Sequence, residues 1–142
     1  MKTLSASAIP LFLLIITSFS FKGKNYGKMN SPLIGTYWNV VGLNGQQVAT
    51  NTTSKPMYLE FKADSTVSGN GGCNAFSGNY SVGKDNEISF GQMVRTNVLC
   101  AGIDYEKNYV NSLAKADHYA INRDTLTLKN ELVNLAKFVG GK

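Results

Sequence analysis

Hydrophobic and polar residues alternate along much of the chain, which is the pattern of half-buried β-strands. In residues 57–62, Met57, Leu59 and Phe61 share one face, and the residues between them share the other. The same period, or a run of β-branched and aromatic residues, predicts further strands at residues 36–41, 76–82, 88–90, 119–121, 125–128 and 132–139. The sequence therefore predicts a mainly β fold of seven or eight strands.

Turn signals separate several of these strands. Asn44 and Gly45 suit the positive φ angles of a type I′ turn, so a strand is expected on each side of them. Residues 83–86 and 122–124 have the composition of turns and predict two further hairpins.

One segment has a different period. Tyr105, Tyr109 and Leu113 recur every four residues between Asp104 and Ala116, which predicts a single amphipathic helix. Asp104 is the expected N-cap. We expect this helix to lie against the sheet, with its tyrosines in the core or at the edge of the core.

The first 20 residues have the composition of an export signal. Lys2 precedes an apolar run at residues 9–16, and Ser18 and Ser20 place small residues where a signal peptidase reads. The apolar stretch is about 13 residues long, against the roughly 20 that cross a bilayer. The sequence therefore predicts a cleaved signal peptide at residues 1–20 and no stable membrane span after cleavage, with an uncleaved interfacial anchor as the alternative.

The remaining chain has room for one domain. With 142 residues, of which 43% are hydrophobic and 16% charged, we expect a basic, glycine-containing tether at residues 21–31 and one folded domain at residues 32–142. The formal charge of +5 is dispersed apart from lysines in the tether, so it favours weak attraction to anionic envelope surfaces and not nucleic-acid binding. The expected location is periplasmic or secreted.

Two cysteines, Cys73 and Cys100, both lie in the predicted mature domain. In an oxidising compartment they can form one intramolecular disulfide, and their spacing suits neither a Cys-x-x-Cys redox motif nor a zinc site. Free buried thiols and a reactive cysteine are the alternatives. A bridge would close a loop of about 28 residues and stabilise the fold by roughly 3 to 4 kcal/mol.

Two blocks of sequence contain the cysteines of the predicted disulfide and carry a family signature. Residues 71–80 read Gly-Gly-Cys-Asn-Ala-Phe-Ser-Gly-Asn-Tyr, and residues 93–100 form a Met-x-x-Thr block that ends in cysteine. Both blocks resemble those of the META domain family, which includes HslJ-like proteins, and Glu106 and Leu113 match its helix positions. The matching motif residues besides the cysteines are Gly71, Gly72, Asn74, Gly78, Tyr80, Met93 and Thr96. The resemblance covers about residues 33–138 and implies a mainly antiparallel, cracked or incomplete barrel with one packed helix.

The resemblance has two departures. No cysteine stands where many relatives carry a lipid anchor, and the last strand reads Leu135-Ala136-Lys137-Phe138 where a Leu-x-Phe alternation is expected. The register of that strand therefore stays open.

The glycines around Cys73 favour a structural role. They permit positive φ angles and close backbone approach, and Asn74 can bond neighbouring amides. A phosphate-binding loop would need glycine at the position of Asn74, and no Lys-Ser or Lys-Thr pair follows.

The sequence nominates no catalytic residue, metal ligand or cofactor site. His118 is the only histidine, and it stands beside Asp117 without a Gly-x-Ser-x-Gly elbow or a cysteine at a suggestive spacing. The acidic residues form no calcium loop. We therefore expect that the protein is not an enzyme and that the Asp117-His118 pair has a surface or capping role.

Three function classes remain open. The resemblance implies an exported, stress-related domain that stabilises or binds an unknown envelope protein, because HslJ-like proteins are associated with the heat response. A carrier of a small apolar or lipid ligand in the barrel mouth is the alternative, and an enzyme is third. A filled or hollow interior would separate the first two, and the expected inward residues are Tyr37, Leu59, Phe61, Tyr80, Phe90 and Leu128.

Overall fold

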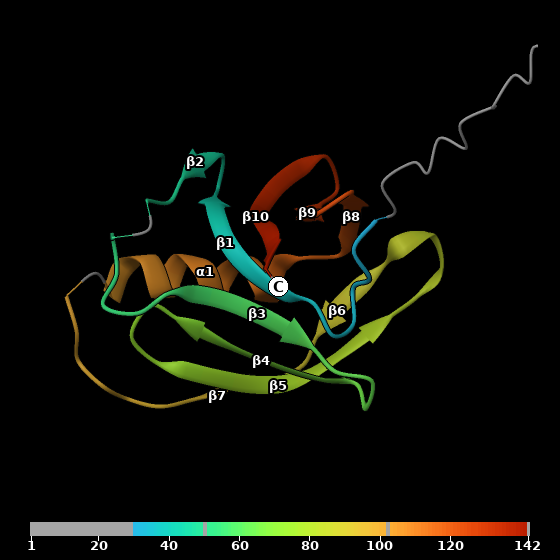
Figure 1. Ribbon diagram of the computed structural model, residues 1–142. Coiled ribbons are helices and arrows are strands. Elements are labelled where there is room, and N and C mark those ends of the chain that lie inside the picture. Colours follow the sequence, from blue (N-terminus) through green and yellow to red (C-terminus); the bar gives the residue numbers. More distant parts are fainter. Residues whose placement is uncertain (1–29, 50, 102, 142) are drawn as a thin grey trace, which may run out of the picture.

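The computed structural model describes residues 30–49, 51–101 and 103–141. The predicted signal peptide and nearly all of the predicted tether lie outside the described residues. Within the described part the elements are β1 (Tyr37–Leu43), β2 (Gln46–Gln47), β3 (Met57–Phe61), β4 (Thr66–Gly71), β5 (Ala75–Val82), a short 3-10 turn (Lys84–Asn86), β6 (Ile88–Phe90), β7 (Val94–Arg95), α1 (Ile103–Lys115), β8 (His118–Asn122), β9 (Thr125–Asn130) and β10 (Val133–Gly141) (Figure 1).

The strands form a nearly closed antiparallel barrel. Eight of them pair in the order β6-β5-β4-β3-β1-β10-β9-β8, while β2 extends β1 and β7 extends β5. The two end strands meet where Glu87 and His118 form an isolated bridge and the Ile88 N–H donates to the Asp117 carbonyl at 2.8 Å. This architecture confirms the predicted barrel with one packed helix.

The turns follow the turn signals of the sequence. Asn44 and Gly45 join β1 to β2 with φ angles of 49° and 79°, as a type I′ turn requires. The hairpins predicted around residues 83–86 and 122–124 join β5 to β6 and β8 to β9.

Helix α1 runs behind β1 and β3 in the view of Figure 1, and it contacts β10 and β4. Tyr109 and Leu113 of the predicted apolar stripe are fully buried, as expected, but Tyr105 is not. Tyr105 is 40% exposed, and the buried helix residues are Glu106, Tyr109, Ser112 and Leu113. The helix begins at Ile103, so Asp104 lies in the first turn and is not the N-cap. The apolar period does not reveal that a glutamate takes the place of a core residue.

The barrel interior is filled with side chains. Of the six residues expected to face inward, Leu59, Phe61 and Leu128 have no exposed surface, Tyr80 is buried, and Phe90 packs against the core at half burial. Side chains that fill the interior leave little room for a guest molecule, so this interior does not favour a ligand in the barrel mouth.

Tyr37 is the exception in the predicted inward set. It is 36% exposed and stacks on Tyr58 with the ring centroids 4.3 Å apart. Its neighbour Trp38 pairs with Leu59 across β1 and β3 and faces the core in its place. Because successive residues of a strand face opposite ways, the inward position of Trp38 sends Tyr37 outward.

A β-bulge sets the register of the last strand. The pairing of β10 with β9 shifts between Asn134 and Ala136, so Leu135 is an extra residue in β10. Ala136 and Phe138 then face inward in alternation, and Leu135 is buried as well. The bulge therefore accounts for the departure from a Leu-x-Phe alternation.

No helix among the described residues is long and apolar enough to cross a membrane.

Candidate functional site

The turn between β4 and β5 brings the motif glycines against α1. A Cβ atom on Gly71 would lie 2.5 Å from the Cγ atom of Glu106, so only glycine allows the helix this close. Gly72 has a φ of 98°, in the region that glycine adopts without strain. These two residues let the backbone turn directly over the Glu106 carboxylate.

Glu106 carries a buried carboxylate whose two oxygens are both hydrogen-bonded. Its Oε2 accepts the Asn74 backbone N–H at 2.7 Å, and its Oε1 accepts the Asn74 Nδ2 at 3.0 Å and the Arg95 Nη1 at 3.0 Å. Glu106 is only 1% exposed, whereas the Arg95 side chain is 46% exposed. A buried charge needs this degree of compensation, because desolvation of an unpaired carboxylate is very costly.

The Asn74 side chain connects the same turn to the segment after β7. Its Oδ1 accepts the Thr96 hydroxyl at 2.8 Å and the Val98 N–H at 2.7 Å, and its Nδ2 also donates to the Val98 carbonyl at 3.0 Å. One amide therefore joins three parts of the chain. We call Asn74, Arg95, Thr96 and Glu106 the motif cluster.

The predicted disulfide is present beside the motif cluster. Cys73 and Cys100 are bonded with their Cα atoms 5.9 Å apart, and the described residues include no free cysteine. The bridge ties the segment that carries Arg95 and Thr96 to the β4–β5 turn. It therefore reinforces the contacts that Asn74 makes with that segment.

The other motif residues serve packing. A Cβ atom on Gly78 would lie 2.6 Å from the Met93 sulfur, so Met93 lies over Gly78. Tyr80 packs edge-on against Phe61 and donates its hydroxyl to the Lys62 carbonyl at 2.9 Å. Each predicted motif residue thus contributes to the turn, the cluster or the core.

Sequence reasoning misses Arg95 and the central place of Glu106. The sequence indicates Glu106 only as a family match, and nothing in the spacing of Arg95 points to a buried partner eleven residues later. The available signal is a glutamate three residues before the buried Tyr109, on the side of the helix that faces the sheet.

His118 lies at the seam between β6 and β8. Its Nδ1 is 2.9 Å from the Asp117 Oδ1, and this hydrogen bond is the main reason that the pKa of Asp117 lies below its usual value. The Asp117 carboxylate also accepts the Glu131 N–H at 3.1 and 3.2 Å. The pair therefore ties the β9–β10 turn to the start of β8.

A surface hollow beside His118 contains two serines, Ser81 and Ser89. Their hydroxyl oxygens are 2.7 Å apart and hydrogen-bond to each other, and both residues are exposed. Within the described residues, His118 is therefore hydrogen-bonded to neither serine, and they form no nucleophile–base pair. No group of three histidine, cysteine or acidic side chains in the described ranges is arranged to hold a metal ion.

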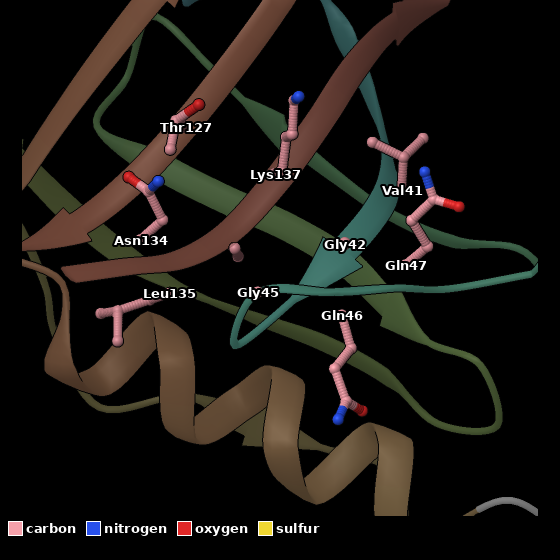
Figure 2. Close-up of a pocket in the computed structure, with 10 residues that line it drawn as sticks. Val41, Gly42, Gly45, Gln46, Gln47, Thr127, Asn134, Leu135 and Lys137 are labelled. Atoms are coloured by element: carbon pink, nitrogen blue, oxygen red, sulfur yellow. The ribbon is translucent and has the colours of Figure 1, made fainter.

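A second hollow, of about 350 Å³, lies on the outer face of the barrel (Figure 2). Gln47, Gly42, Lys137 and Thr127 pair in register across β2, β1, β10 and β9. In Figure 2 Gln47 and Val41 stand on one side and Thr127 and Asn134 on the other, with Lys137 between them, whereas Gln46 and Leu135 point toward the helix. We call this hollow the outer groove; its lining is Val41, Gly42, Gly45, Gln46, Gln47, Thr127, Asn134, Leu135, Ala136 and Lys137.

Comparisons with known proteins place this fold in a family. No curated protein matches the chain significantly. A structure solved by NMR for a protein from Burkholderia xenovorans aligns with a TM-score of 0.61 at 24% identity, over 78% of this chain and 84% of that chain. A DUF4847 family protein from Bacteroides vulgatus, solved by crystallography, aligns with a TM-score of 0.59 at 19% identity, over 78% of this chain and 95% of that chain. These likenesses show a shared fold. The family model of the META domain matches residues 31–140, and the chain therefore belongs to the META domain family.

Proposed function

We propose that this protein is an exported, non-enzymatic META domain of the cell envelope, which acts as a stress-related module that stabilises or binds an envelope protein. The observation that carries the proposal is that the polar side chains of the motif cluster already have hydrogen-bond partners. The polar atoms of Asn74 and the Glu106 carboxylate are engaged in holding turn, helix and loop together. Groups committed in this way are poorly placed to act on a substrate, because a reacting atom needs a free catalytic group within hydrogen-bond reach.

The disulfide supports the export part of the proposal, since such bonds persist in oxidising compartments. The test is to express the full chain in a bacterial host and to measure the intact mass of the periplasmic or secreted protein without reductant. We expect a mass that lacks about residues 1–20 and is two hydrogens lighter than the dithiol form. A full-length cytoplasmic product with two free thiols would contradict export.

The stress-related role is tested in cells. Removal of the gene is expected to lower survival after a heat shock, and the wild-type gene should restore it. His118→Ala is the control for catalysis, because His118 is the only histidine and its side chain is hydrogen-bonded to Asp117. We expect this variant to restore survival fully. Loss of complementation by a folded His118→Ala protein would overturn the non-enzymatic assignment.

A further inference from the structure

We propose that the outer groove is a binding site for a hydroxyl-rich ligand that carries one carboxylate, which is the chemistry of a sugar acid. This inference goes beyond the proposed function, whose partner is an envelope protein, by assigning a separate small-molecule site. Its test uses the purified protein, so its failure would leave the assignments of export and stress role standing.

The groove is a depression in the outer face of the sheet, formed by the strand pairing. Gly42 stands between Gln47 and Lys137 in the cross-strand row and contributes no side chain. The register of β1 also shifts between Val40 and Gly42, which makes Val41 an extra residue at the rim. Bulges of this kind re-aim side chains and are frequent beside binding sites. A Cβ atom on Gly42 would lie 3.3 Å from the Gln46 carbonyl oxygen and 3.5 Å from the Lys137 Cβ, so a side chain at this position would project into the groove. The glycine therefore keeps the hollow of about 350 Å³ open between the flanking side chains.

The polar side chains around this depression are uncommitted. Gln47, Thr127, Asn134 and Lys137 make no side-chain hydrogen bond or ion pair with any described residue. Together they offer two amide groups, one hydroxyl and one ammonium, which are donors and acceptors in close succession. A few convergent polar groups on a largely apolar wall are typical of small-molecule sites.

The strand pairing favours a ligand that hydrogen-bonds to side chains over one that pairs with a strand edge. At the groove, β1 pairs with both β2 and β10, and β10 pairs with both β1 and β9. Neither central strand has a free backbone edge there, so an extended peptide cannot add to the sheet at this point. Vicinal hydroxyls, which both donate and accept, match the amides and the hydroxyl without needing a free strand edge.

The charge and the residue types of the lining limit the possible classes of ligand further. Lys137 is the single charged residue among the ten that line the groove, so it matches one anionic group. The lining contains no aromatic ring, and a nucleobase would have no stacking partner there. A carboxylate beside Lys137 and Thr127, with ring hydroxyls toward Gln47 and Asn134, fits both the charge and the donors.

An adjacent hollow indicates that a longer saccharide can also bind. This hollow, of about 630 Å³, shares Thr127 and Lys137 with the outer groove and adds Arg123 and Asp124. The two hollows therefore meet at Lys137. A chain of uronic acids could place one ring in each, whereas a single sugar acid would occupy the groove alone.

The experiment is a titration of the ¹⁵N-labelled protein followed by ¹H–¹⁵N correlation NMR. The probes are D-glucuronate, D-glucose, acetate and a short oligouronate. We expect glucuronate at millimolar levels to shift the amide signals of Gln47, Asn134 and Lys137, with weaker or no localised effects from glucose and acetate. The oligouronate should bind more tightly and extend the shifts to Arg123. Absence of localised shifts with both glucuronate and the oligouronate, or equal shifts with glucose, would overturn the assignment.

Two variants and one control keep the test specific. Lys137→Gln and Thr127→Val remove the ammonium and the hydroxyl while keeping the approximate shape of each side chain, and each should weaken glucuronate binding about fivefold. Lys84→Gln removes an exposed lysine in the β5–β6 turn and should leave binding unchanged. Unchanged spectra away from the groove will show that the variants are folded. Equal weakening by all three would indicate general charge attraction and would overturn the site.

Discussion

The motif cluster and the outer groove handle polar groups in opposite ways. In the cluster, the Asn74 side chain and the Glu106 carboxylate are buried and fully hydrogen-bonded. In the groove, the side chains of Gln47, Asn134 and Lys137 are exposed and make no hydrogen bond or ion pair with any described residue. The comparison separates the residues by which the family is recognised, which hold the fold, from those that remain available for binding.

The difference has an energetic cause. A buried donor or acceptor that loses its partner keeps its desolvation penalty, which costs about 1 to 3 kcal/mol for a neutral group and more for a charge. An exposed side chain that changes loses only contacts with water. Changes in the cluster should therefore act on stability, and changes in the groove should act on binding.

Removal of the disulfide should have the largest effect. The double substitution Cys73→Ser with Cys100→Ser is expected to lower the free energy of unfolding by about 3 to 4 kcal/mol, because the unfolded chain regains the entropy of a 27-residue loop. Urea denaturation at neutral pH measures this change. The wild-type protein in reductant is the control and should show a similar loss; an unchanged unfolding midpoint in both would refute the structural role of the bridge.

Truncation of the cluster amide comes next. Asn74→Ala removes the side-chain hydrogen bonds to the Thr96 hydroxyl, the Val98 N–H and the Glu106 Oε1. We therefore expect the free energy of unfolding to fall by about 2 to 3 kcal/mol. Asn79→Ala, at an exposed position of β5, is the matched control and should cost less than about 0.5 kcal/mol. Similar unfolding midpoints for the two variants would remove the basis for a special cluster.

Stability at alkaline pH should depend on Tyr109, which is fully buried. Burial raises the pKa of Tyr109 well above its ordinary value, and its hydroxyl donates to the Tyr58 carbonyl at 3.0 Å. Its contribution to stability is present below about pH 10 and is lost as the pH rises further, because the unfolded chain releases the phenolic proton first.

The measurement is thermal unfolding as a function of pH. Tyr109→Phe is expected to flatten the fall in melting temperature above about pH 10, whereas Tyr105→Phe, on the exposed side of α1, should follow the wild-type curve. A wild-type slope in the Tyr109→Phe variant would show that another group causes the alkaline loss.

The smallest effect on stability is expected in the outer groove. Thr127→Val keeps the β-branched shape on a half-exposed strand position and should change the free energy of unfolding by no more than about 0.5 kcal/mol. Differential scanning calorimetry measures it. A loss as large as that of Asn74→Ala would mean that the hydroxyl has a structural partner and is not free for a ligand.

The strands, turns and disulfide could be predicted because each depends on local patterns. The alternation around Leu59 and Phe61 indicates which side faces the core, and Asn44-Gly45 indicates a turn by its φ preferences. The prediction of the helix face is confirmed at Tyr109 and Leu113 but wrong at Tyr105, because an apolar count ranks Tyr105 above Glu106. Only the tertiary contacts of Glu106 with Asn74 and Arg95 make its burial favourable.

The outer groove could not be predicted from the sequence. It depends on the registers that place Gly42 opposite Gln47 and Lys137, and Lys137 opposite Thr127. Those registers are shifted by bulges at Val41 and Leu135, and a shift of one residue moves side chains to the other face of a sheet. The departure of residues 135–138 from a Leu-x-Phe alternation leaves the register of the last strand open without giving the new one, and no such departure marks the bulge at Val41.

One paired measurement tests the division between fold and binding most directly: urea unfolding of Glu106→Gln beside Lys137→Gln. An amide in place of the Glu106 carboxylate has one accepting oxygen and one donating NH2 group. Whichever way it is turned, the NH2 group faces a donor, either the Asn74 backbone N–H or the Asn74 and Arg95 side chains. The first variant should therefore lose about 2 to 4 kcal/mol, a fall in midpoint of roughly 1 to 2 M urea. The second should unfold at the wild-type midpoint. Equal midpoints for the two variants, or a larger loss in Lys137→Gln, would contradict the account.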